Sequence, residues 1–556
     1  MKPIPEMSLR EKIGQMVMVG FHGTEPSPEI VGLLETYHLG GILYFSRNVG
    51  TPKQVYELSS ALHAKAAEGT DIPLWIAIDQ EGGMVARIWE GITLTPGNMA
   101  VGATRQATYA YELARLCGQE LLALGINMNL APCLDINNNP LNPVIGVRSY
   151  GETAELVGEM GAAAVRGYQE AGVSATVKHF PGHGDSSQDS HKALPSLPHS
   201  LKRLRELELV PFKQSFKEGA DAVMTAHIVL PEVDPAEVPA TISKRIITEL
   251  LRGELGYEGV VMTDCLEMDA IAKFYGVEKA AVQAVEAGAD IILVSHTYKR
   301  QVGALEALID AVESGRVSEE RIDESVERIL ALKQKRLSGA GAQAHAHAEK
   351  AYTHPLIPSS WEEAKTRINT SEGQNLVQSV YEQSITLVKD ESNQLPINPR
   401  EPVYVLWPTV ATATEVDEIY EQQGTLGAYL QTSGVTVVER LISTELTLEQ
   451  IDAITAESRN FRQIVALTYN TALYQSQADL INRLNQRQDA RLIVVAVRNP
   501  FDLMDYPEVS TFLASYENRP LAMKAMADVL VGKMPARGRL PVTLLETYPL
   551  GHRLGN

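Results

Sequence analysis

The chain has 556 residues, of which 44% are hydrophobic and 21% charged, a composition typical of globular proteins. This length exceeds what one ordinary hydrophobic core fills, so we expect two large domains or three modest ones. The formal net charge of −20 argues against a nucleic acid or an anionic membrane as partner, because both attract positively charged surfaces.

The cysteines and the N-terminus indicate the compartment. Cys117, Cys133 and Cys265 are odd in number and far apart, which fits a reducing environment better than a disulfide framework. The first fifteen residues lack the apolar segment of a secretory signal, and no run reaches the ~18 apolar residues of a membrane span. We therefore expect a cytoplasmic protein without membrane insertion, unless a signal has been removed.

Residues 1–336 repeat one pattern, in which a short apolar run is followed by an amphipathic segment of helical length. The apolar runs are rich in β-branched residues, as expected of parallel strands that are buried on both faces. They cover residues 16–21, 40–45, 73–79, 126–135, 173–180, 221–228, 259–264 and 289–295. Helical segments lie between them, for example over 51–69, 153–172 and 278–290. Eight such units predict a (β/α)8 TIM barrel, with a doubly wound sheet as the alternative.

Polar side chains follow most of these strands. They are Asp79, Asp135, Lys178, His179, His227, Asp264 and His296. In a barrel, the carboxyl ends of the strands meet on one face, where barrel enzymes hold their active sites. A single residue of this kind could equally be a helix cap or a turn residue. The recurrence after five or more strands indicates a site.

The rest of the chain predicts a linker and a second domain. Residues 337–358 are small, aperiodic and proline-containing, so we interpret them as a linker, and His345 and His347 within it as a weak metal pattern. Residues 404–407, 462–470 and 491–499 have the character of buried strands among helices. We expect residues 359–556 to form an α/β sandwich.

The stretch VKHFPGHGDSSQDSHKALP (177–195) combines three histidines with two aspartates. Its spacing superficially resembles a zinc site, but a proline and two glycines exclude a helix there and no cysteine is nearby. The alternative is an acid/base device, in which Asp189 orients His191 and raises its basicity. Spacing alone leaves open whether Asp189 and His191 only staple the loop. We expect no metal and no cofactor.

Longer segments carry a family resemblance. They are IAIDQEGGMVARI (76–88), APCLDINNNPLNPVIGVRSYG (131–151), VKHFPGHGDSSQDSHKALP (177–195), MTAHIVLPEVDPA (224–236), the stretch 239–271 and GKMPARGRLPVTL (532–544). Together they resemble glycoside hydrolase family 3, and in particular its β-N-acetylglucosaminidases of the cell-wall recycling kind. KHFPGHG followed by Asp-Ser-His marks this branch, because the β-glucosidase branch lacks that tripeptide and takes its acid/base from another domain.

The resemblance assigns roles by position. It implies Asp264 as nucleophile, His191 as acid/base and Asp189 as the residue that tunes His191. It implies a sugar-binding wall of Asp79, Arg87, Arg148, Lys178 and His179, joined by Asp135 and His227. His183 is expected to support the loop. Met84 stands where the family favours a basic residue, which bears on the preference for the leaving group rather than on catalysis.

The implied reaction is a retaining double displacement that removes terminal β-linked N-acetylglucosamine from peptidoglycan-derived or chitin-like glycans. Attack by the substrate's own acetamido group is a rival route. The alternatives in function are a β-glucosidase or β-xylosidase of the same family, an N-acetylglucosaminide phosphorylase, and a non-catalytic sugar-binding protein.

Overall fold

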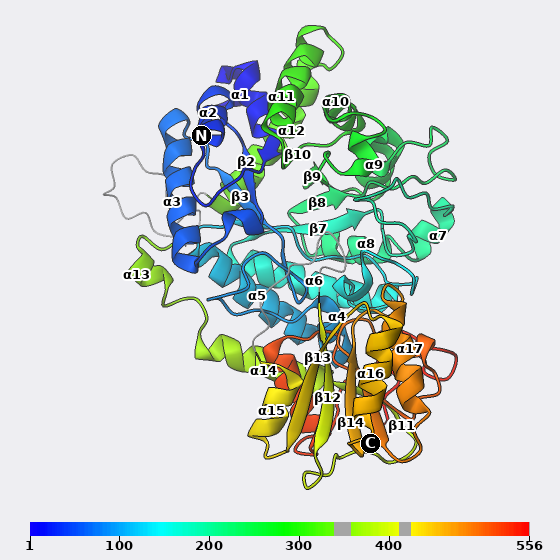
Figure 1. Ribbon diagram of the computed structural model, residues 1–556. Coiled ribbons are helices and arrows are strands. Elements are labelled where there is room, and N and C mark those ends of the chain that lie inside the picture. Colours follow the sequence, from blue (N-terminus) through cyan, green and yellow to red (C-terminus); the bar gives the residue numbers. More distant parts are fainter. Residues whose placement is uncertain (338–356, 411–423, 555–556) are drawn as a thin grey trace.

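The computed structural model describes residues 1–337, 357–410 and 424–554. The molecule is elongated and has two lobes, an upper one of strands ringed by helices and a lower one built on a separate sheet (Figure 1). The predicted linker falls mostly outside the described residues, and so do His345 and His347. The domain boundaries therefore stay a prediction.

The upper lobe is a closed parallel barrel. Its eight strands are β1 (Val17–Val19), β2 (Gly41–Tyr44), β3 (Trp75–Ile78), β6 (Met128–Asn129), β7 (Ser174–Phe180), β8 (Ala222–Thr225), β9 (Val260–Thr263) and β10 (Ile292–Val294). They follow one another around the sheet, and a parallel bridge between Met262 and Ile291 closes it. Each strand lies inside one of the eight predicted apolar runs, and every residue in them is buried. The predicted TIM barrel is confirmed.

Helices cover the outside of the barrel. They are α1 (Leu9–Gln15), α2 (Pro28–Tyr37), α3 (Pro52–Gly69), α4 (Asn98–Thr104), α5 (Ala107–Ala123), α6 (Ala154–Ala171), α7 (Leu201–Glu206), α8 (Val210–Lys217), the π-helix Arg245–Glu254, α9 (Asp269–Ala272), α10 (Val277–Ala287), α11 (Tyr298–Glu313) and α12 (Glu319–Leu337). Several begin with a hydroxyl cap, for example Thr51 before α3 and Thr153 before α6, whose oxygens accept from amides of the first turn. The three helical segments named from the sequence are confirmed.

A short hairpin interrupts the barrel after β3. Strands β4 (Gln80–Gly82) and β5 (Val85–Ala86) pair antiparallel. Gly83 and Met84 form the turn, and Gly82 at the end of β4 and Gly83 have φ of 96° and 56°, which a side chain would strain. This hairpin follows Asp79 directly and leads into Arg87, so it carries two of the predicted binding residues.

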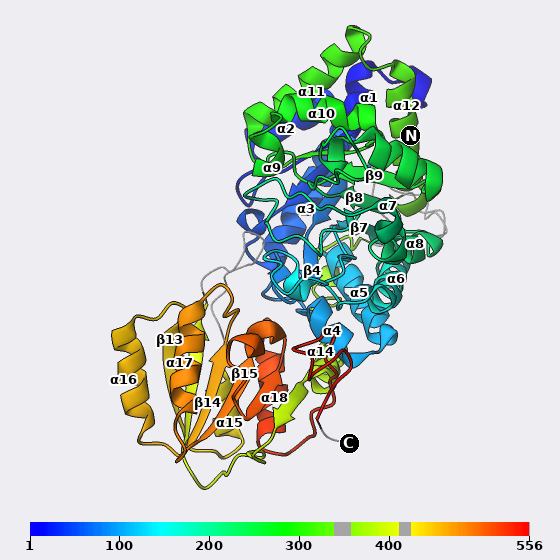
Figure 2. The same cartoon turned by 90° about the vertical axis from the view of Figure 1, so that its right-hand side faces the viewer.

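The lower lobe is a six-stranded sheet between two helical layers (Figure 2). The strands are β11 (Thr386–Asp390), β12 (Val403–Thr409), β13 (Val437–Ser443), β14 (Gln463–Thr468), β15 (Arg491–Ala496) and β16 (Thr511–Ala514). Their order is β11-β16-β15-β14-β12-β13, parallel except for β11. The helices are α14 (Ser371–Ser384), α15 (Leu426–Thr432), α16 (Leu448–Ser458), α17 (Gln475–Asn485) and α18 (Pro520–Leu530), with α13 (Trp361–Ala364) leading in. The predicted second α/β sandwich is confirmed.

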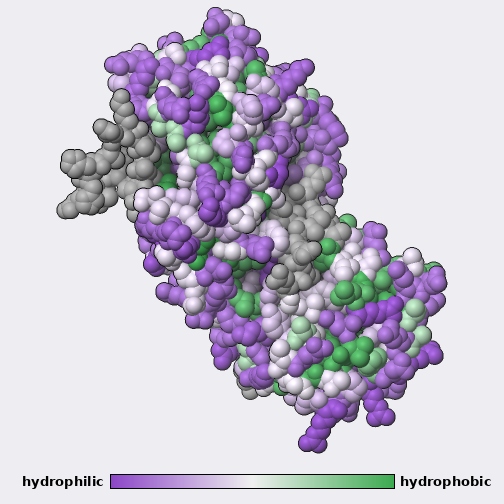
Figure 3. Space-filling model, turned by 60° about the vertical axis from the view of Figure 1, so that its left-hand side comes forward, coloured by the Kyte–Doolittle hydropathy of each residue, from purple (hydrophilic) through white to green (hydrophobic). Residues whose placement is uncertain are grey.

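The barrel has a hydrophobic core of its own, and the core of the lower lobe extends into helices of the barrel. The core of the lower sheet continues into barrel helices α4, α5 and α6 through Met99, Leu113, Val157 and Met160, all buried. Helix α4 packs against α14. The face of the molecule in Figure 3 is largely hydrophilic, with apolar side chains in small separate patches. No helix within the described residues is long and apolar enough to cross a membrane.

Candidate active site

A cavity of about 400 Å³ opens at the carboxyl ends of the barrel strands. Seven of the predicted residues line it. They are Asp79, Arg87, Arg148, Lys178, His179, His191 and Asp264. They come from β3, the β4–β5 hairpin, β7, β9 and two loops, so the barrel brings together residues that are up to 185 positions apart, from Asp79 to Asp264. The strand ends thus meet at one cavity, and the roles expected of these residues stay a prediction.

A buried network of charges forms one wall. Lys178 Nζ donates to Asp79 Oδ1 at 2.6 Å and lies 2.8 Å from Glu81 Oε1. Arg148 donates to both oxygens of Glu81, at 3.0 and 2.7 Å. Arg87 Nη2 lies 3.7 Å from Asp79 Oδ2. Three cations and two carboxylates thus hold one another in fixed orientations.

Glu81 is the part of this wall that the sequence reasoning missed. Burial raises its pKa, but the charges of Arg148 and Lys178 and their hydrogen bonds outweigh burial and hold the pKa well below its usual range. The pKa of Lys178 lies above its usual value, because Asp79 and Glu81 outweigh the effect of its burial. The available signal was the second carboxylate of Asp-Gln-Glu, two residues after Asp79 and on the same face of an extended strand.

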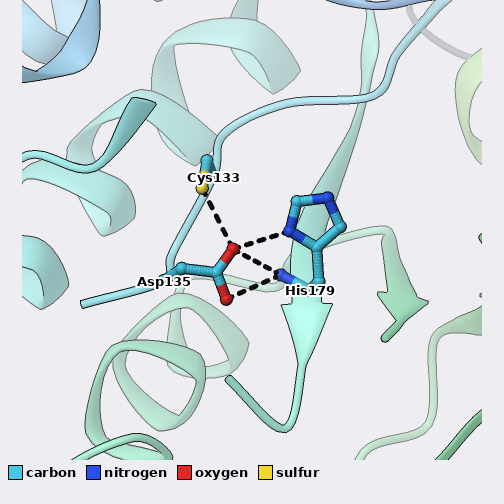
Figure 4. Close-up of side chains that lie close together, drawn as sticks. All are labelled: Cys133, Asp135 and His179. Carbon is cyan, nitrogen blue, oxygen red and sulfur yellow. Dashed lines mark hydrogen bonds and ion pairs between the residues drawn. The ribbon is translucent and has the colours of Figure 1, made fainter. Parts of the chain in front are cut away.

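Asp135 lies behind His179 rather than in the cavity wall (Figure 4). Its Oδ2 is 2.6 Å from His179 Nδ1, and its Oδ1 accepts from the His183 amide at 2.6 Å. Asp135 is completely buried, and the hydrogen bonds hold its pKa below the usual value against burial. It fixes the ring of His179, whose other nitrogen faces Arg148 at 3.5 Å.

Cys133 completes a group with Asp135 and His179 whose ligand atoms lie within 4.8 Å of one another. Such a set could in principle hold a metal. Burial, however, raises the pKa of the Cys133 thiol well above its usual value, so the sulfur carries its proton and donates to Asp135 Oδ2 at 3.2 Å. The carboxylate is already engaged by His179, so the group suits a hydrogen-bonded support better than a metal centre.

Asp264 follows β9 at the floor of the cavity. Its Oδ1 accepts from the Cys265 amide at 2.7 Å, which sets the direction of the carboxylate. Burial raises the pKa of Asp264, but the nearby imidazoles of His227, His179 and His191 outweigh it, and the pKa lies below its usual value. An ionised carboxylate at a rigid strand end is suited to act as a nucleophile.

His227 supports this carboxylate from behind. The ring is buried and is not among the residues that line the cavity. Its Nε2 lies 3.0 Å from the carbonyl of Cys265, and its Nδ1 lies 2.7 Å from Thr241 Oγ1. His227 therefore contacts the backbone next to Asp264, where it can fix the turn after β9.

His191 enters the cavity from the loop after β7. Its Nδ1 lies 2.7 Å from Asp189 Oδ1, and its own amide donates to the same oxygen at 2.9 Å. Burial raises the pKa of Asp189, but the hydrogen bonds and charge of His191 outweigh it and lower that pKa. The predicted dyad is present, and Nε2 of His191 does not contact Asp189 and is available to a substrate.

The loop has a second contact between the two dyad residues, where Ser190 Oγ lies 3.0 Å from His183 Nε2. His183 thus contacts the loop, as expected, and burial lowers its pKa to about 4.

Of the residues at the mouth of the cavity, Phe45 and Arg47 were not singled out in the sequence, whereas His296 was expected at a strand end. Arg47 donates to the carbonyls of Phe21 and Ser295 at 2.8 and 2.6 Å, and lies 3.1 Å from His296 Nδ1. The ring of Phe45 lies 5.0 Å from that of His296. Met84 is buried and lies outside the residues that line the cavity, so its side chain does not contact the space for a sugar.

Comparison with known proteins agrees with this geometry. Residues 8–332 match the model of the glycosyl hydrolase family 3 N-terminal domain. The chain belongs to glycosyl hydrolase family 3. The family resemblance found in the sequence motifs is thereby confirmed.

Among relatives, β-hexosaminidase A of Pseudoalteromonas piscicida is 31% identical, over 93% of this chain and 91% of its own length. A β-hexosaminidase of Alkalilimnicola ehrlichii is 39% identical, but over 50% of this chain and 80% of its own. Among solved structures, a glycoside hydrolase family 3 β-N-acetylglucosaminidase from Paenibacillus sp. str. FPU-7 is 52% identical, with a TM-score of 0.89 and coverage of 96% of this chain and 98% of that one. A β-glucoside phosphorylase has the same fold at 23% identity, with a TM-score of 0.79 and coverage of 97% of this chain and 94% of that one.

Proposed function

We propose that this protein is a retaining exo-β-N-acetylglucosaminidase. The observation that carries the proposal is the meeting of Asp264 and the Asp189–His191 dyad in one cavity whose wall is the charge network of Asp79 and Lys178. The names of two relatives, a β-hexosaminidase and a β-N-acetylglucosaminidase, support the choice of sugar.

The reaction has two displacements. Asp264 attacks the anomeric carbon, while protonated His191 gives its proton to the departing oxygen, and a covalent α-glycosyl ester forms on Asp264. Neutral His191 then takes a proton from water, which attacks the anomeric carbon and releases the sugar and the free carboxylate. A histidine in this role avoids the repulsion that a second carboxylate would exert on the attacking one.

The charged wall is suited to hold the sugar in the −1 subsite, the position of the sugar whose bond is broken. Carboxylate oxygens of Asp79 accept hydrogen bonds from hydroxyl groups, and Lys178, Arg87 and Arg148 donate to others. Asp79 and Glu81 already hold Lys178, and Glu81 also holds Arg148. Substrate hydroxyls therefore meet groups that need little reorganisation. Asp135 acts through His179 in this scheme, and His227 acts through the turn that carries Asp264.

For the leaving group we propose a class rather than one compound, a peptidoglycan-derived or chitin-like glycan. We place the protein in the cytoplasm. The mouth residues Phe45, Arg47 and His296 would contact it, since they lie on the outer rim of the same cavity. An aromatic ring beside a guanidinium is suited to stack on one sugar face and to donate to its oxygens.

Initial rates on chromogenic N-acetyl-β-glucosaminide and β-glucoside in phosphate-free buffer test the proposal. We expect a strong preference for the acetamido sugar, with release that does not depend on phosphate. Equal rates or faster glucoside cleavage would reject the sugar assignment, and turnover only after phosphate addition would identify a phosphorylase. No turnover with either would favour a sugar-binding protein.

Labelling with a 2-fluoro or 5-fluoro glycoside separates the two nucleophiles. We expect one glycosyl group on the peptide that contains Asp264. A reproducible failure to label, in an enzyme that turns over the acetamido substrate, would instead favour attack by the substrate's acetamido group.

A further inference from the structure

A short segment of the second domain, residues 515–519, contacts the hairpin β4–β5 of the barrel; it follows β16 and leads into α18. Two of its charged side chains, Glu517 and Arg519, are 1% and 2% exposed. Both contact the barrel through a polar side-chain atom, and Glu517 also interacts with Tyr381 of its own domain. Buried charges of this kind are costly unless they are held by specific partners.

Their partners are the hairpin β4–β5 and the start of α4. Arg519 donates through Nε, at 3.1 Å, and through Nη2 to the carbonyl of Gly83 in the hairpin turn. Glu517 Oε1 accepts from the amide of Gly97 at 3.0 Å. The two glycines pack against each other, since a Cβ on Gly83 would lie 2.6 Å from the Cα of Gly97. The turn is therefore clamped between two groups of the second domain and a glycine contact.

The clamp lies directly behind the charged wall. A second cavity of about 10 Å³, the space of about one water molecule, is lined by Glu517 and Gly83 on one side and by Glu81 and Arg148 on the other. Glu81 and Arg148 also line the catalytic cavity. Asn98, the residue after Gly97, donates to the Arg148 carbonyl at 2.7 Å. Because Glu81 and Arg148 line both cavities, movement of the turn would shift these two side chains in the catalytic cavity.

The segment itself is held in a strained conformation. Tyr516 has φ of 66°, a region that bulky side chains rarely adopt. Its hydroxyl lies 2.7 Å from Thr386 Oγ1, and Ser515 Oγ donates to the carbonyl of Glu517 at 2.8 Å. The surroundings of Tyr516 fix this backbone and so present Glu517 and Arg519 to the hairpin. Burial raises the pKa of Glu517 to about 7.

We propose that Glu517 and Arg519 are positioning residues for the reaction in the barrel, and that the second domain sets the −1 subsite by fixing the hairpin that carries Asp79, Glu81 and Arg87. The proposal rests on the function proposed above. It gives the second domain a part in catalysis although Glu517 and Arg519 do not line the catalytic cavity.

The test compares Arg519→Met with Arg519→Lys and with a control, Glu152→Ala. The control removes another contact between the domains, because Glu152 accepts from the amide and hydroxyl of Thr543 and contacts neither the hairpin nor the cavity. The kcat and KM for chromogenic N-acetyl-β-glucosaminide are measured per folded enzyme. Amide hydrogen exchange of residues 80–88 is measured in parallel.

We expect Arg519→Met to lower kcat/KM on the order of 100-fold, as misplacement of binding groups by about 1 Å does, and to speed hydrogen exchange in the hairpin. Arg519→Lys should recover part of the rate, since one donor to Gly83 can form. Glu152→Ala should stay within about twofold of the parent, because no cavity residue moves.

The proposal would be overturned if folded Arg519 variants had the same kcat/KM, and the same amide hydrogen exchange in the hairpin, as the Glu152→Ala control. If Arg519→Met does not fold, Arg519→Lys decides by the same comparison. An inactive parent enzyme would reject the proposed function instead, and hairpin exchange would still report whether Arg519 holds the turn.

Discussion

The cavity has two sides of opposite construction. On one side, Asp79, Glu81, Arg148 and Lys178 bond one another, and their side chains are between 3% and 16% exposed. On the other, His191 is 22% exposed and is held by its own neighbour Asp189, with Ser190 contacting His183 below. The comparison teaches that the groups suited to bind are fixed in advance, while the group proposed to transfer a proton twice is placed on a loop with local supports.

The largest effect is expected at Asp264, whose carboxylate is held by the Cys265 amide. Asp264→Ala should lower kcat on the order of 10⁴-fold, because the covalent route is lost. Azide should restore turnover and yield the α-glycosyl azide, since the anion fills the space of the missing carboxylate. Product configuration is read by NMR. A β-glycosyl azide, or near-normal kcat, would remove Asp264 from the nucleophile's role.

The loop side gives the second effect. His191→Ala should slow cleavage between about 10²- and 10⁴-fold for poor leaving groups, and much less for an activated aryl glycoside that departs without a proton. A series of aryl glycosides with different leaving-group pKa values measures this dependence. If the rate instead falls by the same factor for all leaving groups, His191 only supports the loop.

A smaller effect is expected when the charged wall is weakened without removing a reacting group. Glu81→Gln should destabilise the fold by about 3 kcal/mol, because Arg148 and Lys178 lose a buried countercharge, and should raise KM. Urea unfolding measures the stability. Glu232→Gln, at an exposed position, is the matched control and should change the free energy of unfolding by less than about 0.5 kcal/mol.

Glu81 also predicts a dependence of stability on pH. Its folded pKa is depressed, so its contribution is complete above its usual pKa and is lost as the pH falls through the folded value. The parent should therefore lose more free energy of unfolding than Glu81→Gln between pH 6 and the most acidic pH at which both fold. Parallel pH profiles of the two proteins would contradict this.

The smallest effect is expected in the loop support. Ser190→Ala removes the hydroxyl next to His183, a contact worth about 1 kcal/mol, and should lower kcat by about fivefold or less while KM stays unchanged. Ser186→Ala is a comparison within the same loop, since its hydroxyl donates to the carbonyl of Gln188 and not to His183. A Ser190→Ala enzyme as slow as His191→Ala would show that the local support is essential to the loop.

The sequence predicts the barrel because each of its strands lies in a mainly apolar run and these runs alternate with segments of helical period, so local pattern and final fold agree. The same reasoning places Asp79 and Asp264 correctly at the cavity. It cannot tell whether a polar residue at a strand end faces the cavity or backs another side chain, which is why Asp135 and His227 were expected in the wall and lie behind it.

Contacts between distant parts are beyond such patterns. Arg519 and Gly83 are 436 positions apart, and neither stands out in the sequence as part of a site. Glu81 lies closer, but it sits on β4 beyond the strand end, where the rule about barrel strands does not apply. In both cases the missing information is the relative position of two elements, which depends on packing rather than on local periodicity.

The core shared by α4, α5, α6 and the lower sheet limits how this gene could have changed over time. A deletion that left only the barrel would expose Met99, Leu113, Val157 and Met160 together, and such a patch favours aggregation. Loss of the second domain would therefore require several surface substitutions beforehand. A single truncation at the end of the barrel would leave this apolar face uncovered.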